Sequence, residues 1–132
     1  MTEYGGRQYP TVSPYLFYED LPAALDFLTK AFGFVERLRD TRPDGTIGHC
    51  EMTCGESVLM FGSPPGFENP AHTGQVSVGI YVHVDDVDTH FARAVAAGAQ
   101  PQDEPTDQPY GVRSYGALDP EGHQWWFAQV LE

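Results

Sequence analysis

The chain has 132 residues, of which 41% are hydrophobic and 13% aromatic. This composition supports one continuous core and is too apolar for a disordered chain, and no apolar run approaches the roughly 20 residues of a membrane-spanning helix. The 19 acidic residues outnumber the 7 basic ones and give a net charge of −12, which argues against nucleic acid as a partner because Lys and Arg supply the affinity for phosphates.

The cysteines and the N-terminus bear on the cellular compartment. Cys50 and Cys54 fall in one predicted strand, where four residues span about 13 Å, too far for a disulfide whose α-carbons lie within about 7 Å. We therefore expect two buried thiols in a reducing compartment. The N-terminal residues lack the apolar stretch of a signal peptide, so the expected location is the cytoplasm, without membrane association.

The first predicted module opens with a strand and a helix. The apolar run Tyr15–Tyr18 is typical of a short strand, and the following acidic pair is typical of a helix N-cap. Gly33 is the expected C-terminal cap of the helix. The apolar stripe of this helix consists of Leu21, Leu25, Leu28 and Phe32. Three further strands are predicted at about residues 35–40, 46–53 and 57–61.

A turn-rich segment, residues 62–75, separates this module from a second one. The second module again has an apolar strand, an acidic pair and a helix, with Gly98 as its stop. The stripe of the second helix consists of Val87, Phe91, Ala94 and Val95. Strands are predicted at 113–118 and 124–130, with a weaker one near 100–104. We expect a single domain over residues 11–131, with modules at about 11–62 and 76–131.

The two modules repeat each other at an offset of 66 residues (81 minus 15). Tyr15–Leu21 resembles Tyr81–Val87, and the same offset pairs Phe61 with Phe127. Each half is therefore predicted to be β-α-β-β-β, and we expect the halves to match without insertion or deletion. One such unit leaves a sheet face and sheet edges open. The predicted fold class is thus α+β, with two tandem modules whose mixed sheets curl around a cavity.

With these residues in place, the chain resembles the glyoxalase / bleomycin resistance protein / extradiol dioxygenase (vicinal oxygen chelate) superfamily. The segments that carry the resemblance are Pro14–Asp20, Ala31–Phe34, Val84–Asp88, Ala97–Ala99, Pro109–Arg113 and Asp119–Trp125. They cover about residues 11–131, and their order together with the repeat is more specific than any one of them.

The resemblance implies where metal-dependent members hold a divalent ion, on the first and last strand of each module. Those positions fall here on Ser13, Met60, Gly79 and Trp126. Metals of this class take imidazole or carboxylate ligands, and none of these four residues supplies one. We therefore predict no metal and no other cofactor.

A displaced metal site is the weaker alternative. His49 and Glu51 share one face of their predicted strand, and His83 lies on the same strand face as Gly79. These three residues are the best metal-binding set that the chain offers, although a His in a strand is more often a hydrogen-bonded wall residue.

The predicted ligand-binding residues follow from strand parity with the lost metal positions. They are Tyr15, Phe17, Met60, Tyr81, His83 and Trp126, together with Arg113 from the loop before a late strand. The alternative is that the aromatic residues pack the core and that Arg113 forms a surface salt bridge. Aromatic walls with few polar groups are typical of ligand pockets, and exposed indole rings stack on planar or cationic groups.

Two functions remain open at this point. The first is a metal-free protein that binds and sequesters a cationic or planar aromatic compound, such as an antibiotic. By resemblance to bleomycin-resistance proteins, such a protein would be a homodimer. The second is a glyoxalase-like lyase, isomerase or dioxygenase with a displaced metal, so whether the protein is an enzyme is undecided and no catalytic residue is assigned.

Overall fold

The computed structural model describes residues 2–132 and divides them into two compact units. Unit 1 runs to Phe67, except for residues 30–32, which group with unit 2. Unit 2 continues from Glu68 to Glu132. Among the described residues, no helix is long and apolar enough to cross a membrane.

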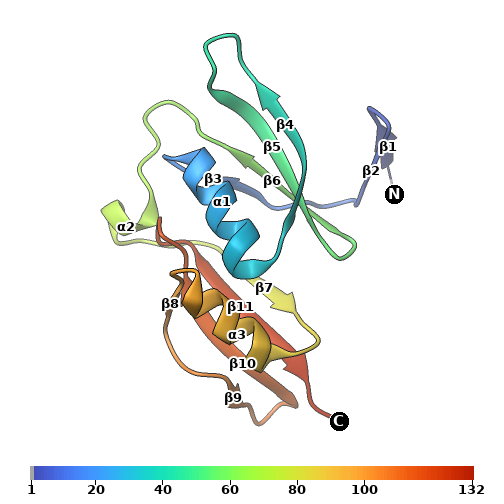
Figure 1. Cartoon of the computed structure of the whole chain (residues 1–132), viewed down its shortest axis with the longest axis vertical. Coiled ribbons are helices and arrows are strands. Elements are labelled where there is room, and N and C mark those ends of the chain that lie inside the picture. Colours follow the sequence, from blue (N-terminus) through green and yellow to red (C-terminus); the bar gives the residue numbers. More distant parts are fainter. Residues whose placement is uncertain (1) are drawn as a thin grey trace. The chain divides into compact units, whose positions relative to one another are not determined.

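Both units have the β-α-β-β-β order that the sequence predicts, with the elements labelled in Figure 1. Unit 1 contains β1 (Thr2–Tyr4), β2 (Arg7–Tyr9), β3 (Tyr15–Phe17), α1 (Leu21–Phe32), β4 (Val35–Thr41), β5 (Ile47–Cys54) and β6 (Ser57–Gly62). Unit 2 contains α2 (Pro70–Thr73), β7 (Gly79–His83), α3 (Val87–Ala96), β8 (Gln100–Pro101), β9 (Thr106–Asp107), β10 (Val112–Leu118) and β11 (Gln124–Val130).

The sheet of unit 1 is mixed and is covered by α1 on one face. Its strand order is β3-β6-β5-β4, with β3 and β6 parallel and the other pairs antiparallel. Asp20 caps α1 by accepting a hydrogen bond from the Ala23 amide at 3.1 Å, and Gly33 ends it in the left-handed conformation at φ 77°. Both helix ends therefore lie where the sequence predicts them.

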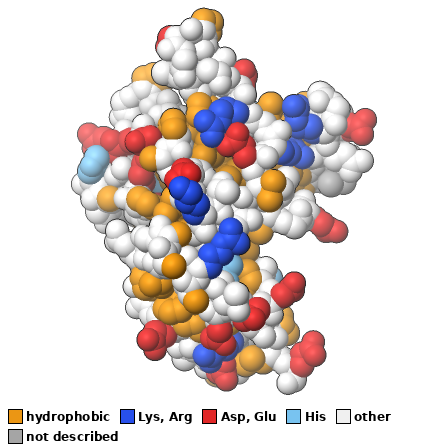
Figure 2. All heavy atoms as spheres, in the orientation of Figure 1, with side chains coloured by type: hydrophobic (Ala, Val, Ile, Leu, Met, Phe, Trp, Pro, Cys, Tyr) orange, Lys and Arg blue, Asp and Glu red, His pale blue; other side chains and the backbone are white. Residues whose placement is uncertain are grey.

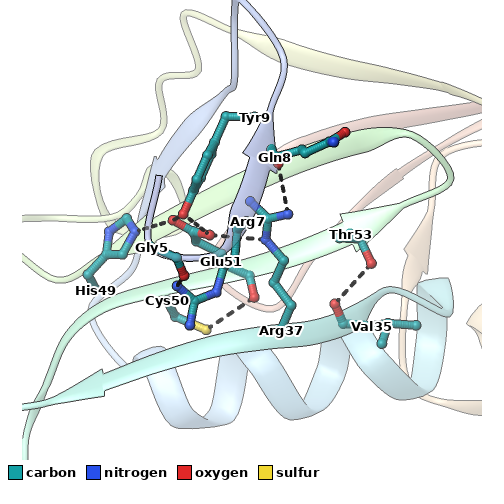
Figure 3. A network of polar contacts seen from close by, with 10 residues as sticks. All are labelled: Gly5, Arg7, Gln8, Tyr9, Val35, Arg37, His49, Cys50, Glu51 and Thr53. Carbon is teal, nitrogen blue, oxygen red and sulfur yellow. Dashed lines mark hydrogen bonds and ion pairs between the residues drawn. The ribbon is translucent and has the colours of Figure 1, made fainter. Parts of the chain in front are cut away.

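Alternation along the strands of unit 1 separates a buried face from an open one. The buried residues that face α1 include Leu16, Cys50, Met52, Leu59 and Phe61. Their neighbours in the sequence point to the opposite face, and Figures 1 and 3 show α1 on the other side of the sheet from the β1–β2 hairpin.

Unit 2 repeats this design around a larger aromatic core. Its sheet has the order β7-β11-β10-β8, with β9 also paired to β10, and β7 runs parallel to β11. Trp125 and Phe127 are fully buried on the face that α3 covers. Phe32, from the end of α1, packs against Phe127 with ring centroids 4.6 Å apart, which explains why it groups with this unit.

The structure also corrects several details. The strand predicted at 100–104 is shorter, because β8 covers only Gln100–Pro101; β9 is a second short strand beyond the predicted range, directly after Pro105. The β1–β2 hairpin and the four-residue α2 inside the predicted linker carry no apolar period and escaped prediction. Cys50 is buried as expected, whereas Cys54 is only half-buried.

The repeat holds in three dimensions, with one exception. Tyr15 lies opposite Met60 across the parallel strands of unit 1, and Tyr81 lies opposite Trp126 in unit 2, both at the 66-residue offset. The next strand slips by one residue: Glu51 pairs with Met60, but Gly116 pairs with Trp126, an offset of 65 (116 minus 51). The expectation of a match without insertion was therefore wrong, and the longer turn between β10 and β11 accounts for the slip.

Candidate functional site

Two aromatic side chains lie exposed on the open face of the unit 1 sheet. Tyr15 is 46% exposed and Phe17 is 43% exposed, and both belong to β3, the edge strand of the sheet beside β6. Met60 is half-buried beside Tyr15 on the same face. The parity prediction for these three residues thus places them together, away from α1.

Tyr15 is held in position by a glycine and a histidine. A Cβ atom added at Gly62 would lie 3.1 Å from Cε1 of the Tyr15 ring, so the ring rests directly on the glycine backbone. The Tyr15 hydroxyl is 2.9 Å from Nδ1 of His49. The ring is therefore fixed at both ends while much of its surface stays accessible.

Behind His49 lies the buried carboxylate of Glu51, which is 1% exposed (Figure 3). Tyr9 donates its hydroxyl hydrogen to both carboxylate oxygens at 2.9 Å, and Arg37 donates Nε–H at 3.1 Å. His49 Nε2 lies 2.8 Å from Oε2. Burial raises the pKa of Glu51, but the hydrogen bonds from His49, Tyr9 and Arg37 outweigh it and leave the pKa below its ordinary value.

An ionised Glu51 determines the direction of the hydrogen bonds. The carboxylate accepts only, so His49 Nε2 carries the hydrogen. In the neutral imidazole Nδ1 then accepts the hydroxyl hydrogen of Tyr15. Burial, with a smaller contribution from the negative charge of Glu51, raises the pKa of Tyr15, so the phenol stays protonated at neutral pH. The chain Glu51–His49–Tyr15 is therefore a positioning network for the exposed ring.

The same carboxylate fastens the N-terminal hairpin to the sheet. The Arg37 guanidinium lies 4.5 Å from the centre of the Tyr9 ring and donates to the Gln8 carbonyl at 3.0 Å. Tyr9 in turn stacks on Tyr4 with centroids 4.0 Å apart. Sequence reasoning missed this hairpin, because only the pairing of Tyr9 with Glu51, 42 residues away, reveals it.

A cavity of about 340 Å³ opens beside these rings in unit 1. It is lined by Tyr15, Phe17, Arg42, Gly48, Gly62, Ser63, Pro64 and Pro65. Its walls are mainly aromatic and apolar, and Arg42 is the one charged side chain among these lining residues.

The open face of unit 2 carries the other predicted aromatic residues. Trp126 is 40% exposed and Tyr81 is 46% exposed, with ring centroids 6.5 Å apart. His83 is the next residue on this face and packs edge-on against Tyr81 at 5.3 Å. The three form one surface of unit 2, opposite α3.

The indole ring of Trp126 rests on the backbone at two glycines. Cζ3 of its six-membered ring occupies the space that a Cβ at Gly79 would need, and a Cβ at Gly116 would lie 3.2 Å from Cδ1. The indole therefore spans β7, β11 and β10 with one face against the backbone. Gln102 and Gln124 border it and exchange amide hydrogen bonds of 2.6 and 2.8 Å. The other indole face is available for stacking.

Unit 2 also has a cavity, of about 510 Å³. It is lined by His83, Val84, Asp85, Gln129, Val130, Leu131 and Glu132. The charged residues of this lining are acidic, in contrast to the arginine in the lining of the unit 1 cavity.

The four positions that would hold a metal do not fit one. The Trp126 ring fills the space above Gly79, and both residues lack imidazole or carboxylate groups. Ser13 and Met60 are no better donors for a divalent ion. Of the displaced set, His49 and Glu51 bond to each other in unit 1, whereas His83 belongs to unit 2. Within residues 2–132, no group of three His, Cys, Asp or Glu side chains is placed to hold a metal.

Arg113 pairs with carboxylates of unit 2. Its guanidinium contacts Asp88 and Asp107, each at 3.1 Å, and all three side chains are partly exposed. This is the surface salt bridge that sequence reasoning gave as its alternative. Arg113 is not among the residues that line the two cavities. Arg42, which does line one, had no sequence signal because it follows a strand with no recognisable motif.

Comparison with known proteins agrees with this architecture. The sequence model of the glyoxalase/bleomycin resistance protein/dioxygenase superfamily matches residues 10–127. An uncharacterised protein of Mycobacterium bovis is 36% identical over 128 residues, covering 92% of this chain and 84% of its own length.

Solved structures show the same fold. TioX from Micromonospora sp. ML1 is 32% identical, with a TM-score of 0.73 over 91% of this chain and 99% of its own. A bleomycin-binding protein complexed with bleomycin is 21% identical, with a TM-score of 0.68 over 91% of this chain and 98% of its own. The chain thus belongs to the glyoxalase/bleomycin resistance protein/dioxygenase superfamily, with the α+β fold of two β-α-β-β-β modules.

Proposed function

We propose that the protein is a metal-free binding protein that sequesters a planar aromatic compound. The observation that carries the proposal is the exposure of Tyr15, Phe17, Tyr81 and Trp126 on the open sheet faces, where metal-dependent relatives would hold their ion. Large aromatic residues at such positions normally lie buried, and a soluble protein that leaves them 40–46% accessible has a surface suited to another flat molecule.

The seat of Trp126 supports stacking as the mode of binding. Because the indole rests on Gly79 and Gly116, one face is supported by the backbone and the other needs no rearrangement to receive a ring. Such preorganisation lowers the cost of binding. A stacked ring contributes about 0.5–1.5 kcal/mol beyond burial, and a cation over the indole about 0.5–2 kcal/mol.

The acidic balance supports a cationic group on the ligand of unit 2. The net charge of −12 is spread over several elements, and on the face shown in Figure 2 the acidic side chains are scattered among basic ones. The cavity of unit 2 adds Asp85 and Glu132 close to His83. Dispersed charge of this kind raises the association rate of a cation more than its final affinity.

A thermal-shift titration tests the proposal. The probe is N-methylquinolinium, and its saturated analogue N-methyldecahydroquinolinium carries the same charge without the flat ring. The planar cation is expected to raise the stability by about 2.7 kcal/mol at 100 times its dissociation constant, and the saturated one to bind much less tightly. Treatment with EDTA is expected to leave the shift unchanged.

Variants locate the binding surface. Trp126→Ala is expected to weaken the planar cation about tenfold, whereas Tyr110→Ala, which removes a tyrosine that is 69% exposed elsewhere, leaves the shift intact. Equal effects of the two substitutions, or a shift that needs added metal, would contradict the proposal.

We also propose that the protein is a homodimer. The exposed side chains of Val12, Val35 and Val78 leave apolar surface that a second chain would cover. Sedimentation equilibrium between about 1 and 100 µM measures this directly. A mass of about twice 14.6 kDa is expected, and a monomer throughout this range would refute the dimer without affecting the binding test.

A further inference from the structure

The cavities of units 1 and 2 occupy equivalent places in the repeat but differ in charge. Phe17 in the lining of one corresponds to His83 in the other at the 66-residue offset, and Ser63 corresponds in the same way to Gln129. Pro64 and Val130 form a third such pair. The two cavities therefore lie at equivalent positions of the repeat, but Arg42 lines the cavity of unit 1 and carboxylates line the cavity of unit 2.

Arg42 differs from the ion-paired arginines of this chain. Arg37, Arg39 and Arg113 each contact a carboxylate within 3.1 Å. Arg42 donates one long hydrogen bond, 3.3 Å from Nη1 to the Thr46 hydroxyl. Among the described residues, no carboxylate lies within ion-pair distance of it. In a protein with a net charge of −12, such an arginine is an uncompensated cation at the edge of an aromatic cavity.

The nearest carboxylate of this turn already has its partners. Asp44 accepts hydrogen bonds from the Thr46 amide at 3.0 Å and from the Thr46 hydroxyl at 2.6 Å. These bonds lower the pKa of Asp44, and the positive charge of Arg42 adds a smaller effect. Asp44 thus stabilises the turn, and the donors of Arg42 remain available to a ligand.

A tight turn between Arg42 and Thr46 sets the position from which the Arg42 side chain extends. The Arg42 amide donates to the Thr46 carbonyl at 2.7 Å, and the Gly45 amide donates back to the Arg42 carbonyl at 2.9 Å. The side chain then passes over Gly48, where an added Cβ would lie 3.4 Å from Nε. The tight turn and the glycine together place the arginine beside the cavity, where the residue is exposed.

We propose that the unit 1 cavity binds an aromatic carboxylate, with the ring against Tyr15 and Phe17 and the carboxylate on Arg42. A guanidinium offers parallel N–H donors that match a carboxylate, and such charge-assisted bonds are stronger than neutral ones. The inference rests on the proposed function, because it names the ligand chemistry of one of the aromatic faces. The inference also extends the proposed function, since the overall charge alone predicts a cationic ligand.

Calorimetric titration with three probes of equal ring size tests this inference. 2-Naphthoate, 2-naphthamide and 2-naphthylmethylammonium share a bicyclic ring and differ in one substituent, which is anionic, neutral and cationic, respectively. The wild-type protein is expected to bind naphthoate about tenfold more tightly than naphthamide at low salt. Arg42→Gln is expected to remove this preference.

Two further variants separate a local effect from a general one. Arg39→Gln deletes the same charge three residues away, outside the lining of the cavity, and is expected to keep the preference for naphthoate. Phe17→Leu is expected to weaken all three probes in a similar proportion, because it changes the ring contact and not the charge.

The outcomes distinguish this inference from the proposed function. Naphthoate binding no tighter than naphthamide, or an Arg39→Gln effect equal to that of Arg42→Gln, overturns the role of Arg42 alone. A complete absence of binding by all three probes and by N-methylquinolinium overturns both. Circular dichroism of each variant confirms that the exposed substitutions leave the fold intact.

Discussion

Units 1 and 2 share one topology but stabilise their open faces in different ways. In unit 1, a buried carboxylate, Glu51, organises Tyr9, Arg37 and His49 behind the exposed Tyr15. In unit 2, the position opposite the last strand is Gly116, which pairs with Trp126 as Glu51 pairs with Met60 in unit 1. The large ring of Trp126 lies over this glycine. A hydrogen-bond network supports the first aromatic face, and bare backbone supports the second.

The difference shows how one repeat yields two chemical surfaces. The buried Glu51 carboxylate needs several polar partners, and one of them, Tyr9, comes from the distant β1–β2 hairpin. A flat apolar ring needs only space, which two glycines supply. We therefore propose separate ligand chemistry for each unit, and substitutions in each can test whether the two open faces are supported in different ways.

The largest effect is expected from the buried carboxylate of unit 1. Glu51→Gln removes the anion that holds Arg37, so we expect a loss of about 3–5 kcal/mol in the free energy of unfolding, measured in urea. Glu36→Gln is the matched control, since it breaks an exposed pair with Arg39 and costs less than about 1 kcal/mol. Similar losses for the two would show that the Glu51 network is unimportant.

Acidification is expected to affect unit 2 first. Burial lowers the pKa of His90 from 6.5 to about 4, and the positive charge of Arg93 acts in the same direction. The unfolded chain therefore binds a proton between pH 6.5 and 4 that the folded chain does not, and stability falls as the pH falls through this window, by up to roughly 3 kcal/mol. The lowered pKa of Glu51 acts later, as the pH falls below its ordinary value of 4.5.

Urea denaturation at several pH values measures this dependence. His90→Asn keeps a hydrogen-bond partner for the Tyr115 hydroxyl, now 2.6 Å from Nδ1, and is expected to flatten the slope between pH 6.5 and 4. An unchanged slope in His90→Asn would assign the acid sensitivity to other groups.

Gly79, on which the Trp126 ring rests, is expected not to tolerate a side chain. Gly79→Ala places a methyl group where the indole lies, so we expect a loss of about 1–3 kcal/mol and a red shift of the tryptophan emission. Gly48→Ala, in a strand of unit 1, meets its nearest neighbour at an ordinary 3.4 Å and is expected to be neutral or slightly stabilising. A harmless Gly79→Ala would mean that the ring does not rest on this strand.

The smallest effect concerns the hydroxyl of Tyr15. Tyr15→Phe keeps the ring over Gly62 and removes its bond to His49, so we expect a loss of about 1 kcal/mol in stability and little change in the binding of naphthoate. Tyr81→Phe is the control in unit 2. A strong loss of binding in Tyr15→Phe would indicate that the hydroxyl contacts the ligand rather than positioning the ring.

Local patterns in the sequence predicted most of the fold. Asp20 and Gly33 are chemically suited to helix ends, and alternation along short strands identified the face of Tyr15 and of Trp126. The one-residue slip of β10 was not predictable, because it depends on which residues pair across a longer turn.

The chemistry of the open faces was harder to predict than the fold. Parity brought Tyr81, His83 and Trp126 together correctly, but the partners of Glu51 come from a hairpin whose sequence is polar and without period. Arg42 looks like any charged residue after a strand. Its importance depends on what it does not contact, and a linear sequence carries no information about such absences.

The central claim is that the exposed face of Trp126 binds a planar ring, and its indole N–H resonance tests this most directly. Trp125 serves as an internal control, because it is fully buried and donates Nε1–H to Asp119 at 3.1 Å. In a titration with N-methylquinolinium, we expect a saturable upfield shift of the Trp126 signal and a stationary Trp125 signal. Two stationary signals at saturating probe, or equal movement of both, would contradict the account.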